Sequence, residues 1–377
     1  MKKIILHLIA ILFLCYASQA QNLTQNNWTD YTGWHTGAKN IPVWGGWVRE
    51  YAPNKTGLGL VNPQTMQFDQ TLLDSLYNTL AVLDTTIDMM ELDGGLGSAR
   101  DTAKVKAYMS MIESDSALFW KDIVYKQCYK LAQLPDSKNR MYYQLGNEIS
   151  SPAYSQTIRY WQGQGYTSGL GYDQFIIPYY VENFIAPTIE ALDSASLDYF
   201  GQKGMINICL GSITNAASPF AKAFLDSVLN YTIKGTYASS LAGKKVYELI
   251  HIITIHYMMG TDLTNQWENT MNAYASWFGN GRIRGVWSTE EVGIKSATRG
   301  DGASTGARAT CRYLKWSIDN NYSARTTRTN YYGWNNGTTN TKVNDFNNEL
   351  YSFLGKTKLQ YINPMNSTYL IPRFYAL

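Results

Sequence analysis

Short runs of apolar and β-branched residues alternate along this chain with longer amphipathic stretches. A strand is expected where apolar residues run or alternate over about four to eight positions, and a helix where they recur every three or four. Repeated strand–helix alternation is typical of an α/β fold with a parallel sheet. The pattern predicts strands at 87–92, 141–146, 205–210, 249–256, 285–289 and 327–333, with a weaker one at 43–48.

The amphipathic stretches between these strands predict helices that cover the sheet. Asn62-Pro63 supplies a turn before the first helix, and Asp69 stands where an N-cap or first-turn acid favours a helix start. One strand of a full eight is missing, and we place it within residues 21–66. Because no glycine-rich phosphate loop follows the first strand, the fold expected is a (β/α)8 TIM barrel rather than a doubly wound sheet. The predicted helices span 68–83, 103–134, 174–192, 220–229, 266–278, 307–319 and 344–353.

The N-terminal segment has the pattern of a signal peptide. Two lysines precede an apolar run over 4–16, and small residues then occupy the positions that a signal peptidase reads. We expect cleavage before Gln21, which leaves 21–377 as one domain in a secreted or periplasmic protein. An uncleaved anchor is disfavoured because the run is shorter than the ~20 residues of a membrane span. Lipidation at Cys15 is disfavoured because Leu14 stands where a small residue is expected.

Composition excludes several classes of protein. Charged residues make up 16%, below the usual ~25%, and the formal net charge is only +3, so a nucleic-acid partner is not expected. The four cysteines are too sparse and too far apart for a disulfide framework, and no Cys/His spacing predicts a metal site. No later stretch is long and apolar enough to span a membrane. The 29 Tyr and 11 Trp suit a protein that handles amphipathic molecules such as sugars.

Carboxylates close two of the predicted strands. Asn147-Glu148 follows the strand 141–146, and Glu290-Glu291 follows the strand 285–289. In a TIM barrel the active site lies where strands end and the following loops begin. Partial burial of a strand-end carboxyl raises its pKa toward the working pH and makes it a proton donor, which is the role expected of Glu148. The alternatives are a surface Glu148 that caps the next helix and an acidic pair at a helix start.

Strand geometry distinguishes the two adjacent glutamates, because consecutive residues point to opposite faces. If Glu290 faces the barrel interior, so does Ser288, while Trp287 packs outward against helices. If Glu291 faces inward, Trp287 must fit into the crowded centre. This argument favours Glu290 and leaves Glu291 as the alternative. Two carboxyls at strand ends are what cleavage of a glycosidic bond requires.

The motifs Gly146-Asn147-Glu148 and Trp287-Ser-Thr-Glu290 resemble those of the retaining glycoside hydrolases with (β/α)8 barrels, known as clan A. In that clan the Asn-Glu pair closes the fourth strand and a second Glu closes the seventh, and the predicted strand order agrees. The resemblance implies double displacement, with Glu148 as acid/base and Glu290 as nucleophile. Glu291-Val292-Gly293 also matches the clan's Glu-x-Gly ending, so Glu291 remains the alternative nucleophile. No metal or organic cofactor is implied.

The resemblance extends to residues expected to bind substrate. It implies such a role for Asn147, for His256 and Tyr257 after the sixth strand, and for Trp334 after the eighth. The sequence departs from the clan in carrying Met258 where an aromatic usually lies two residues after the His. The alternatives for His256 and Trp334 are packing roles.

Arginines suggest what kind of glycan is bound. Arg49, an arginine expected near the nucleophile, has a surface ion pair with Glu50 as its alternative. Basic residues outnumber acidic ones between residues 282 and 328, and Arg299 lies there in a glycine-rich loop. Arginine suits sulfate and carboxylate groups, so an anionic or sulfated polysaccharide is a hypothesis for the substrate. Solvated helix faces would give the same excess.

Two other function classes remain as alternatives. A secreted glycan-binding protein without catalysis would keep the barrel and its aromatic residues but would have no need of both carboxyls. A hydrolase of another type would show a His-Glu-x-x-His helix, which does not occur, or a Gly-x-Ser-x-Gly elbow directly after a strand. Gly302-Ala-Ser-Thr-Gly306 has the spacing of that elbow but lies in the glycine-rich loop and not at the end of a predicted strand. The sequence therefore favours a glycosidase that acts on a polysaccharide or oligosaccharide.

Overall fold

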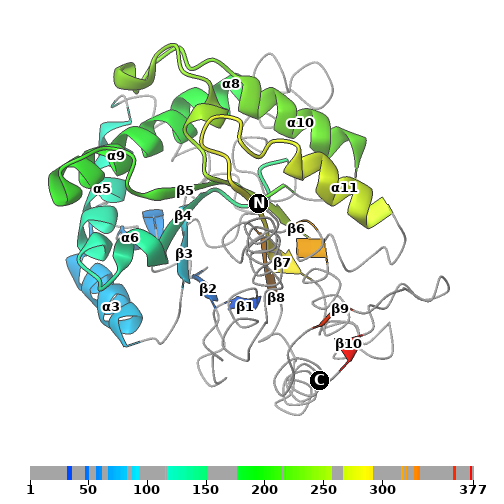
Figure 1. The fold of residues 1–377 in the computed structure, drawn as a ribbon. Coiled ribbons are helices and arrows are strands. Elements are labelled where there is room, and N and C mark those ends of the chain that lie inside the picture. The colour runs from blue at the N-terminus through cyan, green and yellow to red at the C-terminus, as the bar shows by residue number, and fades with distance from the viewer. Residues whose placement is uncertain are drawn as a thin grey trace, which may run out of the picture.

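Eight strands form the centre of the molecule, each parallel to its neighbours and arranged in chain order, and pairing of β1 with β8 closes them into a barrel (Figure 1). The computed structural model describes residues 32–35, 47–50, 57–61, 67–82, 87–92, 115, 117–150, 176–213, 216, 218–256, 266–291, 316–317, 320, 327–331, 360–361 and 374–375. The strands are β1 (Thr32–His35), β2 (Trp47–Glu50), β3 (Ile87–Leu92), β4 (Met141–Leu145), β5 (Asn207–Leu210), β6 (Ile252–His256), β7 (Gly285–Glu291) and β8 (Thr327–Tyr331), with a separate antiparallel pair of β9 (Gln360–Tyr361) and β10 (Phe374–Tyr375).

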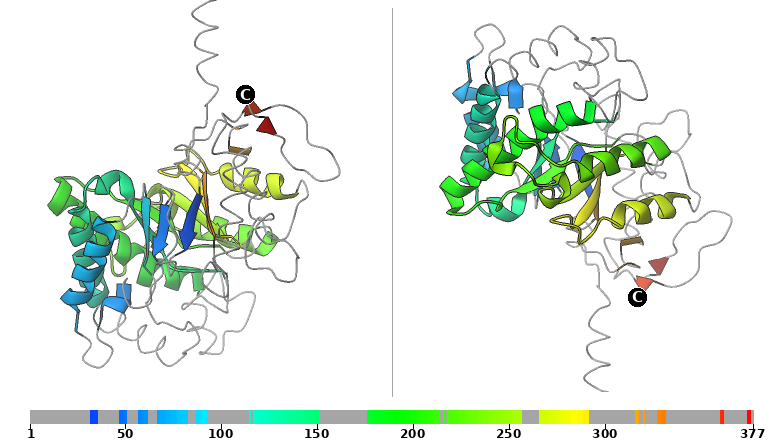
Figure 2. Two further views of the ribbon diagram at one scale, coloured as in Figure 1. Left: turned by 90° about the horizontal axis from the view of Figure 1, so that it is seen from below. Right: turned by 90° about the horizontal axis from the view of Figure 1, so that it is seen from above.

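Helices lie outside the ring of strands (Figure 2). Among them α5 packs against both α9 and α3, so neighbouring connections of the barrel share one apolar layer with the outer faces of the strands. The helices are α3 (Gln70–Ala81), α5 (Leu118–Ala132), α6 (Ser137–Arg140), α8 (Ile177–Tyr180), the π-helical η4 (Val181–Ile185), α9 (Ala186–Phe200), α10 (Pro219–Asn230) and α11 (Gln266–Ala275), with the 3-10 turns η2 (Gly57–Leu60), η5 (Ser239–Leu241) and η6 (Val246–Glu248).

The α/β class and the parallel sheet predicted from the sequence are confirmed. The missing strand is β1, inside the predicted interval 21–66, and β2 lies a few residues later than the predicted 43–48. Asp69 is the N-cap of α3, where its carboxylate accepts hydrogen bonds from the backbone N–H groups of Thr71 and Leu72. A short polar side chain that accepts these bonds satisfies donors with no partner inside the helix.

Several helix boundaries differ from the predictions. The helix predicted at 174–192 is instead a run of α8, η4 and α9 that continues to Phe200, because Ala195 and Ser196 keep the buried face of α9 beyond the predicted end. Within the part of the chain that the structure describes, no helix is long and apolar enough to cross a membrane. The signal peptide 1–20, the helix 344–353 and most of the helix 307–319 lie outside the described residues.

One side chain from each of β3 to β7 fills the barrel interior. Met89, Tyr142, Cys209, Ile252 and Trp287 form a buried cluster separate from the layer shared with the helices. The rings of Tyr142 and Trp287 lie 4.7 Å apart between centroids. The prediction that Trp287 packs outward against helices is therefore wrong. The small Cys209 thiol and the adaptable Met89 leave room for two large rings in this layer.

His251, just before β6, is a buried neutral histidine. Its Nδ1 accepts a hydrogen bond from the backbone N–H of Ile208 at 3.1 Å. Burial, together with the nearby positive charges of Arg284 and Arg282, lowers the pKa of His251 to about 3. The ring must therefore stay neutral in the folded protein at pH values where it is protonated in the unfolded chain.

This histidine predicts a pH-dependent loss of stability. The pKa of His251 is lower in the folded protein than in the unfolded chain. Its contribution to the free energy of unfolding is therefore complete above pH ~6.5 and is lost as the pH falls toward 3, at up to ~1.4 kcal/mol per pH unit. The variant His251→Asn keeps a side-chain acceptor but no group that titrates in this range. Between pH 7.5 and pH 5 its free energy of unfolding is expected to fall by about 2 kcal/mol less than that of the wild type. Urea unfolding at the two pH values measures this, and equal losses in both proteins would contradict it.

Candidate functional site

Glu148 lies immediately beyond β4, at the carboxyl end of the barrel. Its side chain is buried although it is ionisable, with the residue only 2% exposed. Its backbone is left-handed, with φ of 46°, and follows the equally left-handed Gly146. Glycine adopts this conformation freely, whereas for another residue it costs roughly 1–2 kcal/mol. A buried acid on a strained backbone is a combination found at functional sites.

His256, the last residue of β6, holds the Glu148 carboxyl from across the barrel. Its Nδ1 lies 3.1 Å from Oε1 of Glu148, and its Nε2 lies 3.1 Å from Oγ1 of Thr289 on β7. All three residues are buried. Because a hydroxyl both donates and accepts, Thr289 suits either tautomer of the imidazole. The trio therefore matches an ionised Glu148, with the proton on Nδ1, and also a protonated Glu148, with the proton on Nε2.

The second carboxyl oxygen of Glu148 is in a different position. Oε2 is buried and has no hydrogen-bond partner among the described residues. One oxygen is thus fixed by His256, while no described residue is hydrogen-bonded to the other.

An irregularity in β7 places Glu290 beside His256. On the β6 side, Ile255 pairs with Ser288 but His256 pairs with Glu290, so β7 contains one extra residue at this point. Such a bulge interrupts the strict alternation of faces along a strand. The prediction that Glu290 faces the barrel interior rested on Trp287 pointing outward and on strict alternation along β7. Neither holds, because Trp287 lies inside the barrel and the strand contains a bulge. The observed register nonetheless pairs the Glu290 Cα with that of His256, and the Glu291 Cα with that of Tyr331 on β8.

The structure brings together some of the site residues predicted from the sequence. Asn147 and Glu148 are adjacent, and His256 reaches Glu148. Arg49 lies on β2, with its Cα paired to Met89 on β3. The side chains of Arg49, Glu290 and Glu291 lie outside the described part of the chain, as do the whole of Tyr257, Arg299 and Trp334.

Sequence reasoning missed two residues of the site, Thr289 and Ser212. Ser212 follows β5 and is fully buried, and its hydroxyl donates to Oδ1 of Asn147 at 3.2 Å. Both lie at or just beyond the carboxyl ends of strands, which is the criterion that pointed to Glu148. Applied to Ser and Thr as well as to carboxylates, that criterion would have found them.

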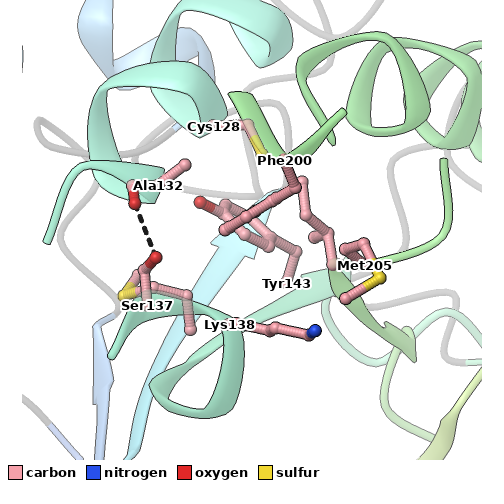
Figure 3. Close-up of a pocket in the computed structure, with 9 residues that line it drawn as sticks. Cys128, Ala132, Ser137, Lys138, Tyr143, Phe200 and Met205 are labelled. Atoms are coloured by element: carbon pink, nitrogen blue, oxygen red, sulfur yellow. Dashed lines mark hydrogen bonds between the residues drawn. The ribbon is translucent and has the colours of Figure 1, made fainter. Parts of the chain in front are cut away.

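The described residues gather no three His, Cys, Asp or Glu side chains as ligands for a metal ion. A cavity elsewhere lies between the outer face of β4 and helices α5 and α9 (Figure 3). Cys128, Tyr143 and Phe200 contribute to its mainly apolar lining, and burial raises the pKa of the Cys128 thiol to about 12. Its volume of about 10 Å³ is scarcely enough for one water molecule, so it is no substrate site.

Comparison with known proteins identifies a related fold. No family model matches the chain, and no curated protein matches its sequence. A broad-specificity GH5-4 endoglucanase from an uncultured bacterium matches 87% of this chain and 96% of its own, with a TM-score of 0.53 and 11% identity. This chain shares the fold of a clan A glycoside hydrolase. PbGH5A, a family 5 glycoside hydrolase from Prevotella bryantii B14, matches 88% of this chain and 97% of its own at 12% identity, with a TM-score of 0.47.

The fold resemblance that the sequence motifs predicted is therefore confirmed, while the family within the clan is not assigned. At 11% identity the likeness concerns the path of the backbone. The roles of individual residues therefore depend on the geometry of the site and not on the shared fold.

The buried carboxyl of Glu148 predicts a stabilising substitution. Glu148→Gln replaces a buried ionisable group, whose Oε2 has no partner among the described residues, with a neutral amide, so the free energy of unfolding is expected to rise by about 1 kcal/mol. Glu190→Gln is the control, because Glu190 already contacts Lys121 and Ser240 and should not gain. Urea unfolding compares the two variants. A loss of stability in Glu148→Gln would show that the carboxylate is well accommodated in the fold.

Proposed function

We propose that this protein is a secreted or periplasmic glycoside hydrolase that cleaves a polysaccharide or oligosaccharide with retention of configuration. The observation that carries the proposal is the buried Glu148 carboxyl, held by His256 at one oxygen and without a described partner at the other. Its support is the register of Glu290 beside His256 and a fold shared with a glycoside hydrolase. Within this proposal, residues 21–377 form one catalytic (β/α)8 domain after a cleaved signal peptide.

The proposed reaction is a double displacement by two carboxyls. Glu148 protonates the leaving glycosidic oxygen from Oε2 while Glu290 attacks the anomeric carbon and forms a glycosyl-enzyme. Glu148 then takes a proton from water, and that water releases the sugar from Glu290. This mechanism needs the two carboxyls ~5–5.5 Å apart. Glu291, one residue further along β7, is the alternative nucleophile.

The His256–Thr289 pair suits an acid that must become a base between the two steps. When Glu148 is protonated, His256 accepts at Nδ1 and donates from Nε2 to Thr289. When Glu148 is ionised, Nδ1 donates to it and the Thr289 hydroxyl donates to Nε2. Both states keep every hydrogen bond of the trio, so the change of role leaves no buried polar group unpaired at these atoms.

Further residues are proposed to bind the sugar. Asn147 lies beside Glu148 and offers an amide to a sugar hydroxyl. Trp334 is proposed to stack on the sugar through its indole face, while Tyr257 and Arg49 are proposed to hold the nucleophile ionised by hydrogen bonding and charge. The proposed chemistry uses the two carboxyls and a water molecule and needs no cofactor.

Substitution of the three glutamates tests the mechanism. Glu148→Gln and Glu290→Gln are each expected to lower turnover by at least ~100-fold, because each removes a group that acts in the transition state. Glu291→Gln is the matched control and is expected to keep most of the activity. Product release is measured on a panel of neutral and sulfated polysaccharides, and the anomeric configuration of the first product by NMR. A larger loss in Glu291→Gln than in Glu290→Gln would reverse the assignment.

The panel also separates the proposal from its rival. Binding to a polysaccharide without products, in wild type and Glu148→Gln alike, would identify a glycan-binding protein instead. A product of inverted configuration would eliminate the glycosyl-enzyme and with it the nucleophile.

Arg299 tests the class of substrate. If the substrate is sulfated or otherwise anionic, Arg299→Ala is expected to raise KM on it by roughly tenfold, since a charge-assisted hydrogen bond is worth ~1.5–3 kcal/mol. KM on a neutral glucan should not change. Equal activity of the wild type on neutral and sulfated polysaccharides, unaffected by Arg299→Ala, would remove the anionic substrate.

A further inference from the structure

A single buried serine is hydrogen-bonded to the turn that carries Glu148. Ser212, two residues beyond β5, accepts a hydrogen bond at Oγ from the backbone N–H of Glu148 at 2.8 Å. The same hydroxyl donates to Oδ1 of Asn147 at 3.2 Å. The backbone carbonyl of Ser212 accepts the N–H of Ile149 at 2.9 Å. Three consecutive residues after β4 are thus bonded to one residue after β5.

The chain after β5 can make these bonds because it approaches β4 very closely. A Cβ added at Gly211 would lie 2.2 Å from the carbonyl oxygen of Leu145 and 2.5 Å from a methyl carbon of Ile149. Only glycine fits between these atoms without displacing the backbone. The hydroxyl of Tyr180 donates to the same Leu145 carbonyl at 2.6 Å, which fixes the end of β4 from the helix side. The position of Ser212 relative to Glu148 is therefore set by buried packing on both strands.

We propose that Ser212 is a positioning residue for the acid/base carboxyl, an inference that rests on the proposed function. Glu148 has a left-handed backbone, and its N–H is held by the Ser212 hydroxyl. The direction of that N–H determines where the Cα–Cβ bond points, and hence where the carboxyl meets His256. None of the described hydrogen bonds of Ser212 reaches the Glu148 carboxyl. Ser212 acts through the backbone of Glu148. Without the Ser212 hydroxyl, the buried N–H of Glu148 has no acceptor, and the unfavourable left-handed backbone of Glu148 loses a hydrogen bond that holds it.

The structure offers a matched control in Ser196 near the end of α9. Ser196 is also fully buried, and its hydroxyl also accepts one hydrogen bond, from the N–H of Met205, and donates one, to the carbonyl of Gln202. It precedes β5, whereas Ser212 follows it, so the two serines serve opposite ends of the same strand. Ser196→Ala therefore reports the general cost of removing such a serine.

The test compares a substrate that needs an acid with one that does not. On a polysaccharide that the wild type hydrolyses, Ser212→Ala is expected to lower kcat by ten- to a hundredfold with KM changed by less than about twofold. On the glycosyl fluoride of the same sugar, kcat/KM should fall by less than about threefold, because kcat/KM reports the glycosylation step and the fluoride leaving group needs no protonation there. Ser196→Ala should keep the wild-type ratio between the two substrates. Equal losses of Ser212→Ala on both substrates, or no loss on either, would overturn the proposal.

A second measurement needs no substrate. Hydrogen exchange of the amide of Glu148 is expected to be faster in Ser212→Ala than in the wild type and in Ser196→Ala, at equal global stability. Unchanged exchange at this amide would show that Ser212 does not hold it. The two hypotheses fail separately. Full activity of Glu148→Gln would contradict the proposed function, whereas an inactive Glu148→Gln beside a fully active Ser212→Ala would contradict this inference alone.

Discussion

A carboxyl group can be buried in a folded protein only where the fold supplies it with a partner, and in this molecule the partner is His256. Glu148 and His256 are 108 residues apart in the sequence and lie at the ends of β4 and β6, with β5 between them. The contact exists because parallel strands end at one edge of the barrel. Everything proposed for the chemistry depends on it, since it fixes one oxygen of the Glu148 carboxyl.

The buried contact is supported from two further strands. Thr289 on β7 holds the far side of the imidazole, and Ser212 after β5 holds the backbone of Glu148. These supports act on different parts of Glu148. Thr289 orients the imidazole that contacts the carboxyl, and Ser212 orients the backbone that carries the side chain. Positioning groups that are themselves buried and hydrogen-bonded keep a reactive side chain within the narrow limits that catalysis tolerates. The left-handed conformation of Glu148 is compatible with such a design, because buried bonds around it offset the strain.

The bulge in β7 shows how one extra residue changes a site. Up to Ser288 the strand alternates regularly, with Trp287 in the interior layer of the barrel. With strict alternation, Trp287 inside would have placed Glu291 rather than Glu290 on the inner face. The inserted residue shifts the register so that Glu290 pairs with His256 while Thr289 still reaches the imidazole. A local irregularity therefore allows both a large interior side chain at Trp287 and the backbone pairing of Glu290 with His256.

Local patterns in the sequence were sufficient for the α/β class, most strand positions, the Asp69 cap and the position of Glu148 at the end of β4, because each depends on residues close together in the chain. Only the tertiary structure decided that Trp287 lies inside the barrel, that Glu290 pairs with His256, and that Ser212 and Thr289 belong to the site. These features depend on register between strands and on the room left by side chains from other strands. Neither is encoded within a local window of sequence, because a bulge changes the facing of every residue beyond it.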